Sequence, residues 1–165
     1  MIIQKFIKYI DSSKKKYYHL YETNNFSGGN MKIEFIGKVK DGYIERELCP
    51  RQGYYDSKHF TLEIDPKYLE ACEDIEPGDY LQVLYYPHTV KRDILKKVQP
   101  VTKKLTGVFS TRAPERPNPI NICIVKVVSI DGGKIEVTGL DVMDGSPIID
   151  IKGYSKELHQ NLLDK

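Results

Sequence analysis

Two arginines stand in a stretch of chain whose backbone is unusually restricted. Residues 107–122 read GVFSTRAPERPNPINI and contain three prolines, Pro114, Pro117 and Pro119. Each proline fixes its own φ and removes a backbone donor, and it pushes the preceding residue away from the α region. We therefore expect a stiff loop that carries Arg112 and Arg116. A guanidinium suits carboxylates and phosphates, although a Pro-rich turn with two solvated arginines is the alternative.

Carboxylates that could serve acid–base chemistry follow later, in the stretch GLDVMDGSPIIDIKGY at 139–154. Asp141 and Asp144 stand on either side of an apolar pair, Val142 and Met143, and Asp144-Gly145 is a turn signal. A positioned carboxylate can take a proton from a reacting group. The equally supported alternative is that both are turn carboxylates bonding their own backbone.

Together these two stretches resemble the β-barrel S-adenosylmethionine-dependent tRNA (adenine-N6)-methyltransferases, which modify the adenosine beside the anticodon. Members of that family carry a GVFATRSPxRPNPIG-like run followed by an LDxxDGTPVLDIKPY-like run. The resemblance covers about residues 32–154 and is strongest after Gly107. The chain departs at Asn121, where the family usually has glycine, and it stops soon after Tyr154, whereas many bacterial relatives continue into a further domain.

The resemblance implies S-adenosyl-L-methionine as the cofactor and assigns roles to individual residues. Those implied to hold the cofactor are Arg51, Gln52, His88, Pro114, Ile124, Leu140, Asp141, Val142 and Met143. Asp141 is the predicted base or the group that orients the acceptor nitrogen. Arg112 and Arg116, the other predicted catalytic residues, are assigned to RNA phosphate or to the carboxylate of a threonylcarbamoyl adenosine.

Partners follow from the same resemblance. It implies a tRNA substrate and a homodimer whose interface completes the site, twofold pairing being the commonest way for one chain to supply a second surface. Two alternatives stay open: a methyltransferase acting on another RNA or a small molecule, and an RNA-binding barrel without catalysis. Cofactor affinity and methyl transfer to tRNA distinguish the three hypotheses.

The elements that must position these residues are mostly strands. No alternating βα series and no GxGxxG at the start of a helix are present, so a doubly wound nucleotide-binding sheet is not expected. The alternation at 59–64 and 80–86 predicts strands, and 134–140 predicts the return strand of a hairpin. The nearly unbroken apolar run at 120–130 predicts a strand buried on both faces. The family resemblance implies that the strands close as a small antiparallel β-barrel.

Helices are expected to be few and peripheral. Asp65-Pro66 is a start signal for a short internal helix that runs to about Asp74 and buries Leu69 and Cys72. Ile2, Ile3, Phe6, Ile7 and Ile10 recur at helical spacing. We therefore predict an N-terminal extension over 1–30 that contains a helix, a barrel domain over 31–154, and a helical tail over 155–165 through Leu158, Leu162 and Leu163.

Composition bounds the remaining possibilities. The 165 residues carry a formal net charge of +2, but residues 91–104 hold six basic side chains against Asp93 alone. This basic cluster has two interpretations: it binds along the phosphate backbone of a nucleic acid, or it is a solvated loop. Three scattered cysteines and four histidines show no metal-ligand spacing, so reduced thiols in a cytoplasmic protein without a metal are expected. No apolar run has the length of a membrane span or the form of a signal peptide.

Overall fold

A computed structural model describes residues 6–11, 16–21, 32–157 and 160. Contacts divide the chain into two compact units, Met1–Ile33 and Glu34–Lys165. In the first unit, β1 (Phe6–Asp11) pairs antiparallel with β2 (Lys16–Tyr21). The predicted N-terminal helix is therefore wrong over the described part of its range, and Ile2 and Ile3 lie outside it. Aromatic and β-branched residues, which favour strands, dominate both segments and outweigh the helical spacing.

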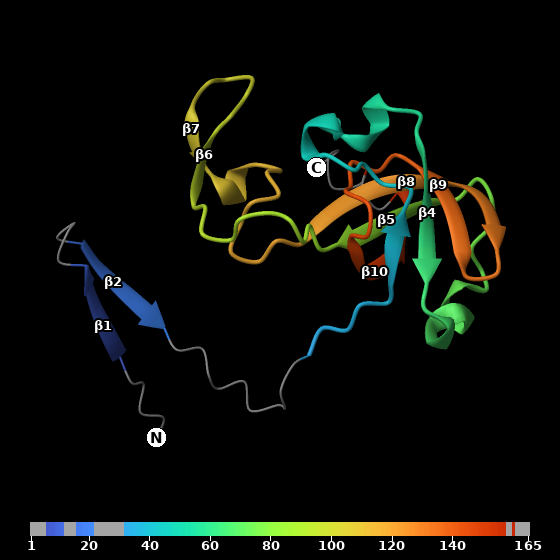
Figure 1. Cartoon of the computed structure of the whole chain (residues 1–165), viewed down its shortest axis with the longest axis horizontal. Coiled ribbons are helices and arrows are strands. Elements are labelled where there is room, and N and C mark those ends of the chain that lie inside the picture. Colours follow the sequence, from blue (N-terminus) through green and yellow to red (C-terminus); the bar gives the residue numbers. More distant parts are fainter. Residues whose placement is uncertain (1–5, 12–15, 22–31, 158–159, 161–165) are drawn as a thin grey trace. The chain divides into compact units, whose positions relative to one another are not determined.

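The second unit is built around a closed antiparallel barrel of six strands, which confirms the mainly β fold (Figure 1). The strands are β3 (Gly37–Lys40), β4 (His59–Ile64), β5 (Tyr80–Tyr85), β8 (Asn121–Asp131), β9 (Lys134–Thr138) and β10 (Pro147–Gly153). Around the barrel their order is β10-β3-β4-β9-β8-β5. Because β10 pairs with both β3 and β5, it closes the ring.

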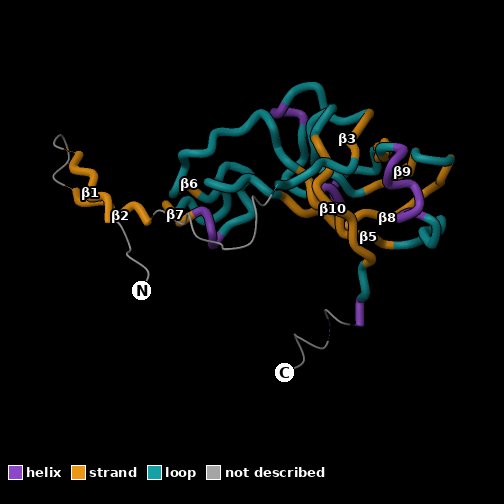
Figure 2. The backbone as a smooth tube through the Cα atoms, turned by 90° about the horizontal axis from the view of Figure 1, so that it is seen from below, coloured by secondary structure: helices purple, strands orange, loops and turns teal. Residues whose placement is uncertain are grey.

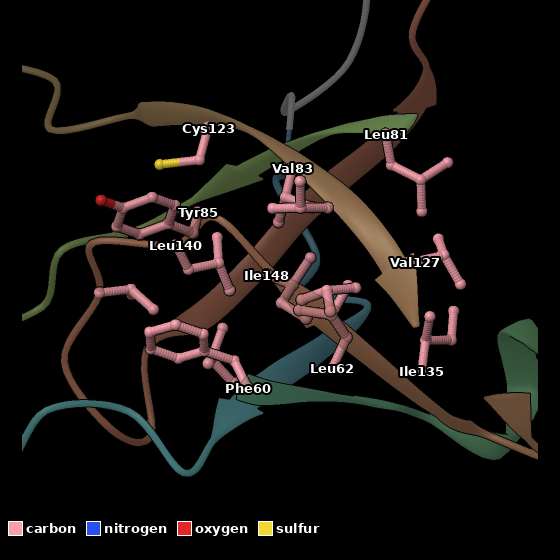
Figure 3. Packing of buried hydrophobic residues seen from close by; sticks show 14 of the residues in the cluster. Phe60, Leu62, Leu81, Val83, Tyr85, Cys123, Val127, Ile135, Leu140 and Ile148 are labelled. Atoms are coloured by element: carbon pink, nitrogen blue, oxygen red, sulfur yellow. The ribbon is translucent and has the colours of Figure 1, made fainter. Parts of the chain in front are cut away.

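The barrel interior is filled by every second residue of its strands. β4 and β5 share the same alternation, so Phe60, Leu62 and Ile64 face inward from β4 as Leu81, Val83 and Tyr85 do from β5. Figure 3 shows these side chains meeting those of β8, β9 and β10 in one cluster. Period-two alternation is the pattern of a strand with one face on a core, and the predicted strands at 59–64, 80–86 and 134–140 are confirmed.

β8 differs from its prediction. Its inward residues Cys123, Val125 and Val127 are buried, but Ile122, Ile124 and Val128 on the opposite face are exposed, Ile124 by 47%. In a closed barrel only one face of each strand points into the core. The unbroken apolar run therefore describes a strand that is buried on one face and apolar on both.

The internal helix forms where Asp65-Pro66 predicted it, as the 3-10 helix η3 (Pro66–Cys72). The Asp65 carboxylate accepts a hydrogen bond of 3.2 Å from the Lys67 backbone N–H, which is N-capping. Cys72 is partly buried against the core, but Leu69 is exposed, contrary to its prediction. Tyr68 and Cys72 pack against the core, while the Leu69 side chain lies beside Gly133.

Most of the chain between β5 and β8 is loop (Figure 2). It includes a short hairpin, β6 (Lys96–Val98) with β7 (Leu105–Gly107), which forms a separate sheet outside the barrel order, and then the single turn η4 (Val108–Ser110). We call residues 95–109 the arm. Two further turns, η1 (Arg46–Leu48) and η2 (Gly53–Tyr55), lie between β3 and β4.

The C-terminal tail is described only at 155–157 and 160. Lys156, Glu157 and Gln160 have helical backbone, while Leu158, Leu162 and Leu163 of the predicted tail helix lie outside the described residues. Among the described residues, no helix has the length and apolar character needed to cross a membrane.

Candidate active site

The Pro-rich loop is fastened by one of its own arginines. The Arg116 guanidinium donates to three main-chain carbonyls, those of Ala113 (3.1 Å), Val108 (2.8 Å) and Thr111 (2.8 Å). A partly buried guanidinium with its donors on carbonyls of one loop acts as an internal brace. Arg116 thus sets the shape of the loop together with the prolines, and its predicted catalytic role stays a prediction.

The Arg112 guanidinium is less engaged by the protein than that of Arg116. This side chain is exposed, and Nη2 donates to the Ile122 carbonyl at 3.1 Å. No other hydrogen bond of the Arg112 guanidinium occurs among the described residues. The rest of its planar donor fork therefore faces solvent and could meet an anion.

The second signature stretch is interlocked with the turn after β3. Tyr43 donates its N–H to the Val142 carbonyl (3.0 Å), and Asp144 donates its own to the Tyr43 carbonyl (2.9 Å). The Asp144 Oδ1 accepts from the Gly42 N–H at 3.1 Å. A Cβ at Gly42 would lie 2.3 Å from the Asp144 nitrogen, so the two segments touch through backbone. Asp144 is thus structural, bonding a distant backbone rather than its own turn.

Asp141 has a different environment. Its Oδ1 accepts from the Tyr85 hydroxyl at 2.9 Å and from the Cys123 thiol at 3.0 Å, and the Asn121 amide donates to the same hydroxyl at 3.2 Å. Figure 3 shows the Tyr85 oxygen and the Cys123 sulfur together at one end of the core. Burial raises the pKa of both groups, with the nearby Asp141 carboxylate adding to the rise. Both therefore keep their protons at neutral pH and serve as donors to Asp141.

Two cavities meet at this carboxylate. The larger of these two, of about 200 Å³ and called the main cavity below, brings together many of the predicted residues; its lining includes Arg51, Arg112, Pro114, Asp141, Val142 and Met143. The smaller cavity, of about 160 Å³, includes Gln52 and Arg116 in its lining. Tyr85, Arg112, Asn121 and Asp141 line both cavities. These four residues, which we call the shared wall, stand between the two spaces.

Other predicted cofactor residues lie outside the main cavity lining. Leu140 is fully buried in the barrel core, and the Ile124 side chain is on the outward face of β8. His88 is exposed, with its Nδ1 3.3 Å from Oγ of Ser146, a residue of the main cavity. For these three residues, contact with a ligand through the side chain stays a prediction, and the geometry favours it for His88 over the other two.

A partly buried ion cluster holds the Pro-rich loop through Glu115 and was not predicted from the sequence. Glu115 is 8% exposed, and its Oε1 accepts from Arg46 and, at 2.6 Å, from Lys97 of β6. Burial opposes ionisation of Glu115, but the hydrogen bonds from Lys97 and Arg46 prevail and lower its pKa. The signal in the sequence was the single acidic residue of the Pro-rich loop, which follows the basic stretch 91–104. This cluster joins the η1 turn, the arm and the loop, and Arg46 also lines the main cavity.

The sulfur atoms near the main cavity are not nucleophiles. Cys49 Sγ lies 3.8 Å from Met143 Sδ, and burial together with the Asp141 charge raises the pKa of Cys49 to about 11. A neutral thiol is a weak nucleophile and behaves as a small apolar group. Within the described part of the chain, no group of three or more His, Cys, Asp or Glu could hold a metal ion.

The chain matches known proteins over most of its length. The tRNA-methyltransferase O N-terminal domain matches residues 38–160. A relative from Methanothermobacter thermautotrophicus is 39% identical over 128 residues, which are 78% of this chain and 93% of the relative. The S-adenosyl-L-methionine-binding protein of Archaeoglobus fulgidus is 38% identical over 128 residues, with 78% and 92% coverage.

Solved structures agree. The crystal structure of TrmO from Pseudomonas aeruginosa has a TM-score of 0.65 and 28% identity, and the match covers 79% of this chain and 58% of that chain. The chain thus spans well under two thirds of that TrmO. The resemblance predicted from residues 107–122 and 139–154 is confirmed by these matches. The chain belongs to the family of the tRNA-methyltransferase O N-terminal domain.

Proposed function

We propose that this barrel is an S-adenosyl-L-methionine-dependent methyltransferase that acts on N6 of a threonylcarbamoyl adenosine next to the tRNA anticodon. The observation that carries the proposal is the position of Asp141 and Arg112 in the shared wall between two cavities. One space can take a methyl donor and the other an acceptor. The names of the relatives, which include an S-adenosyl-L-methionine-binding protein, support the choice of donor.

The residues of the main cavity fit such a donor. Asp141 supplies a negative charge opposite a positively charged sulfur, while Val142, Met143 and Pro114 supply apolar surface for its adenosine and side-chain carbons. Arg51 is exposed at the rim, where it suits a carboxylate. The cavity of about 200 Å³ in one chain is smaller than the ~300–1,000 Å³ of pockets that enclose drug-sized ligands. One chain would therefore cover only part of the donor.

The reaction asks the protein mainly for alignment. Bound adenosylmethionine supplies a methyl group whose bond to sulfur breaks, leaving the electron pair on sulfur, as the acceptor nitrogen forms its bond to carbon. Asp141 would orient the acceptor N–H and receive the proton that the nitrogen loses. Its Oδ1 is already engaged by Tyr85 and Cys123, and Oδ2 makes no hydrogen bond among the described residues, so Oδ2 would do this work. Arg112 would hold the threonylcarbamoyl carboxylate or an RNA phosphate.

A homodimer is part of the proposal. The arm presents exposed apolar side chains, among them the cross-strand pair Val98 and Leu105, and Phe109 is 80% exposed. Lys97 ties this arm to Glu115 of the Pro-rich loop. A second copy seated on the arm would bury this apolar surface and enclose the open side of the main cavity.

Light scattering at micromolar concentration should report twice the chain mass, and Val98→Glu should reduce the reported mass to that of one chain. A fully active monomer would show that one chain suffices.

Calorimetry with adenosylmethionine tests the donor, and transfer of a labelled methyl group to unfractionated tRNA tests the reaction. We expect micromolar affinity, and label in a threonylcarbamoyl adenosine after nuclease digestion. Asp141→Asn should lower the rate of transfer at least about a hundredfold. Asp131→Asn, at the exposed last residue of β8, is the matched control and should leave the rate unchanged.

Two other outcomes correspond to the alternatives. Affinity for tRNA without heat on adding adenosylmethionine would identify an RNA-binding barrel and exclude the methyltransferase. Affinity for adenosylmethionine with unlabelled tRNA would identify a methyltransferase with another substrate. A cytoplasmic location is proposed with the tRNA substrate.

A further inference from the structure

Asn121 and Tyr85 face each other at the ends of two neighbouring strands. They are direct partners in the antiparallel register of β5 and β8, at the last residue of one strand and the first of the other. Directly opposed residues on a barrel strand share a face. The Asn121 Nδ2 donates to the Tyr85 hydroxyl at 3.2 Å, and Tyr85 is only 3% exposed, so its ring is held in place.

The contact with Asn121 determines which partner accepts the hydrogen bond of the Tyr85 hydroxyl. A phenol hydroxyl has one proton to donate. Because the Asn121 amide donates to the Tyr85 oxygen, the hydroxyl proton is directed to its other partner, Asp141 Oδ1 at 2.9 Å. The Cys123 thiol donates to the same Oδ1 at 3.0 Å. The carboxylate is thus clamped through one oxygen.

We propose that Asn121 is a positioning residue that acts through Tyr85 to hold Asp141 with Oδ2 presented to the reacting atoms. The inference rests on the proposed function, because it takes Asp141 as the group beside those atoms. Asn121 itself lines both cavities, but the proposal assigns its amide to Tyr85 and not to a ligand. The direction of one hydroxyl proton is what the amide controls.

Asn121→Asp tests this direction with little change in shape. An ionised Asp accepts but does not donate, so it would compete with Asp141 for the single Tyr85 proton. We expect kcat to fall about tenfold, with KM for tRNA and the calorimetric affinity for adenosylmethionine within about twofold of the native values. Asn121→Ala, which only removes the donor, should fall by less, about threefold.

Tyr85→Phe and the double variant complete the test. Tyr85→Phe should lower kcat about as much as Asn121→Asp does. Adding Asn121→Asp to Tyr85→Phe should lower kcat no further, because the hydrogen bond from Tyr85 to Asp141 is already absent. Asn118→Ala, at an exposed residue of the Pro-rich loop just before β8, is the control. The inference is overturned if Asn121→Asp and Tyr85→Phe keep full kcat, if their losses multiply, or if the loss lies wholly in cofactor affinity. A native protein without methyl transfer would instead refute the proposed function.

A second readout does not depend on turnover. The side-chain amide of Asn121, assigned in the NMR spectrum by its loss in Asn121→Ala, should shift in Tyr85→Phe and remain in place in Asn118→Ala. If the Asn121 amide signal does not shift in Tyr85→Phe, the contact between the two side chains is not made in solution. That result would overturn the inference whatever the activity of the variants.

Discussion

Replacing Arg116 by alanine should destabilise the barrel more than it disturbs any ligand contact. Its guanidinium donates to the carbonyl of Val108, the first residue of η4, and to those of Thr111 and Ala113, which follow this turn. A hydrogen bond to a charged group contributes about 1.5–3 kcal/mol. The side chain is only partly buried, so the freed carbonyls regain some water, and we expect a loss of about 3 kcal/mol rather than the sum of three full bonds.

Thermal unfolding measures this effect. For a domain of this size a loss of about 3 kcal/mol corresponds to a melting temperature roughly 10 °C lower. Arg116→Lys should lie between alanine and the native protein, since an ammonium cannot span the three carbonyls as the planar fork does. Arg92→Ala is the control, because its exposed guanidinium places both donors on the single Pro117 carbonyl. An Arg116→Ala protein with native melting temperature but no methyl transfer would refute the argument and return Arg116 to a direct role.

Three further predictions follow from other contacts. Gly53→Ala should unfold the protein or cost roughly 3 kcal/mol or more, seen as loss of the urea transition, because a Cβ there would lie 1.8 Å from the Gly139 carbonyl oxygen. Glu115→Gln should lower stability at pH 7 in urea titrations. The pKa of Glu115 is lowered in the folded protein, so its stabilisation is present above the unfolded value of about 4.3 and is lost as the pH falls from there through the folded value, where native and variant should converge. Cys49, with a pKa of about 11, should be alkylated only slowly at pH 8 and progressively faster towards pH 11, as mass spectrometry of its peptide can follow.

Local patterns in the sequence were sufficient for the strands that have one polar face. The residues of β4, β5 and β9 alternate, and alternation reports directly which side chains meet the core. The Asp65 cap was equally readable, because its hydrogen bond reaches only to Lys67. Each of these features is decided within a few residues.

What could not be predicted depends on segments distant in the chain. The apolar run of β8 says nothing of whether a second layer covers its outer face, since that depends on the barrel closing. Arg116 could be assigned to a ligand as easily as to its own loop until the three carbonyls were located. The cluster of Arg46, Lys97 and Glu115 joins three segments that no spacing rule connects.

For Asp141, the residue itself could be predicted from the sequence, but its hydrogen-bond partners could not. Its motif predicted a functional carboxylate, and Asp141 lines both cavities, but its role stays a prediction. The donors that hold it, Tyr85 and Cys123, come from β5 and β8 and carry no signature of their own. Only the register between those strands brings them to the same oxygen.

The closing of the ring by β10 has a consequence for how the chain acquires its structure. β10 pairs with β3 on one side and with β5 on the other, so the barrel keeps two unpaired strand edges until residues 147–153 have been synthesised. Pairings between distant segments form slowly, and during that interval the open edges of β3 and β5 can pair with strands of other chains. β8 itself lies between β5 and β9, so its two edges are covered without β10, and it is β3 and β5 whose edges β10 covers. Nascent chains that end before residue 147 should therefore aggregate, whereas those that extend past residue 153 should fold.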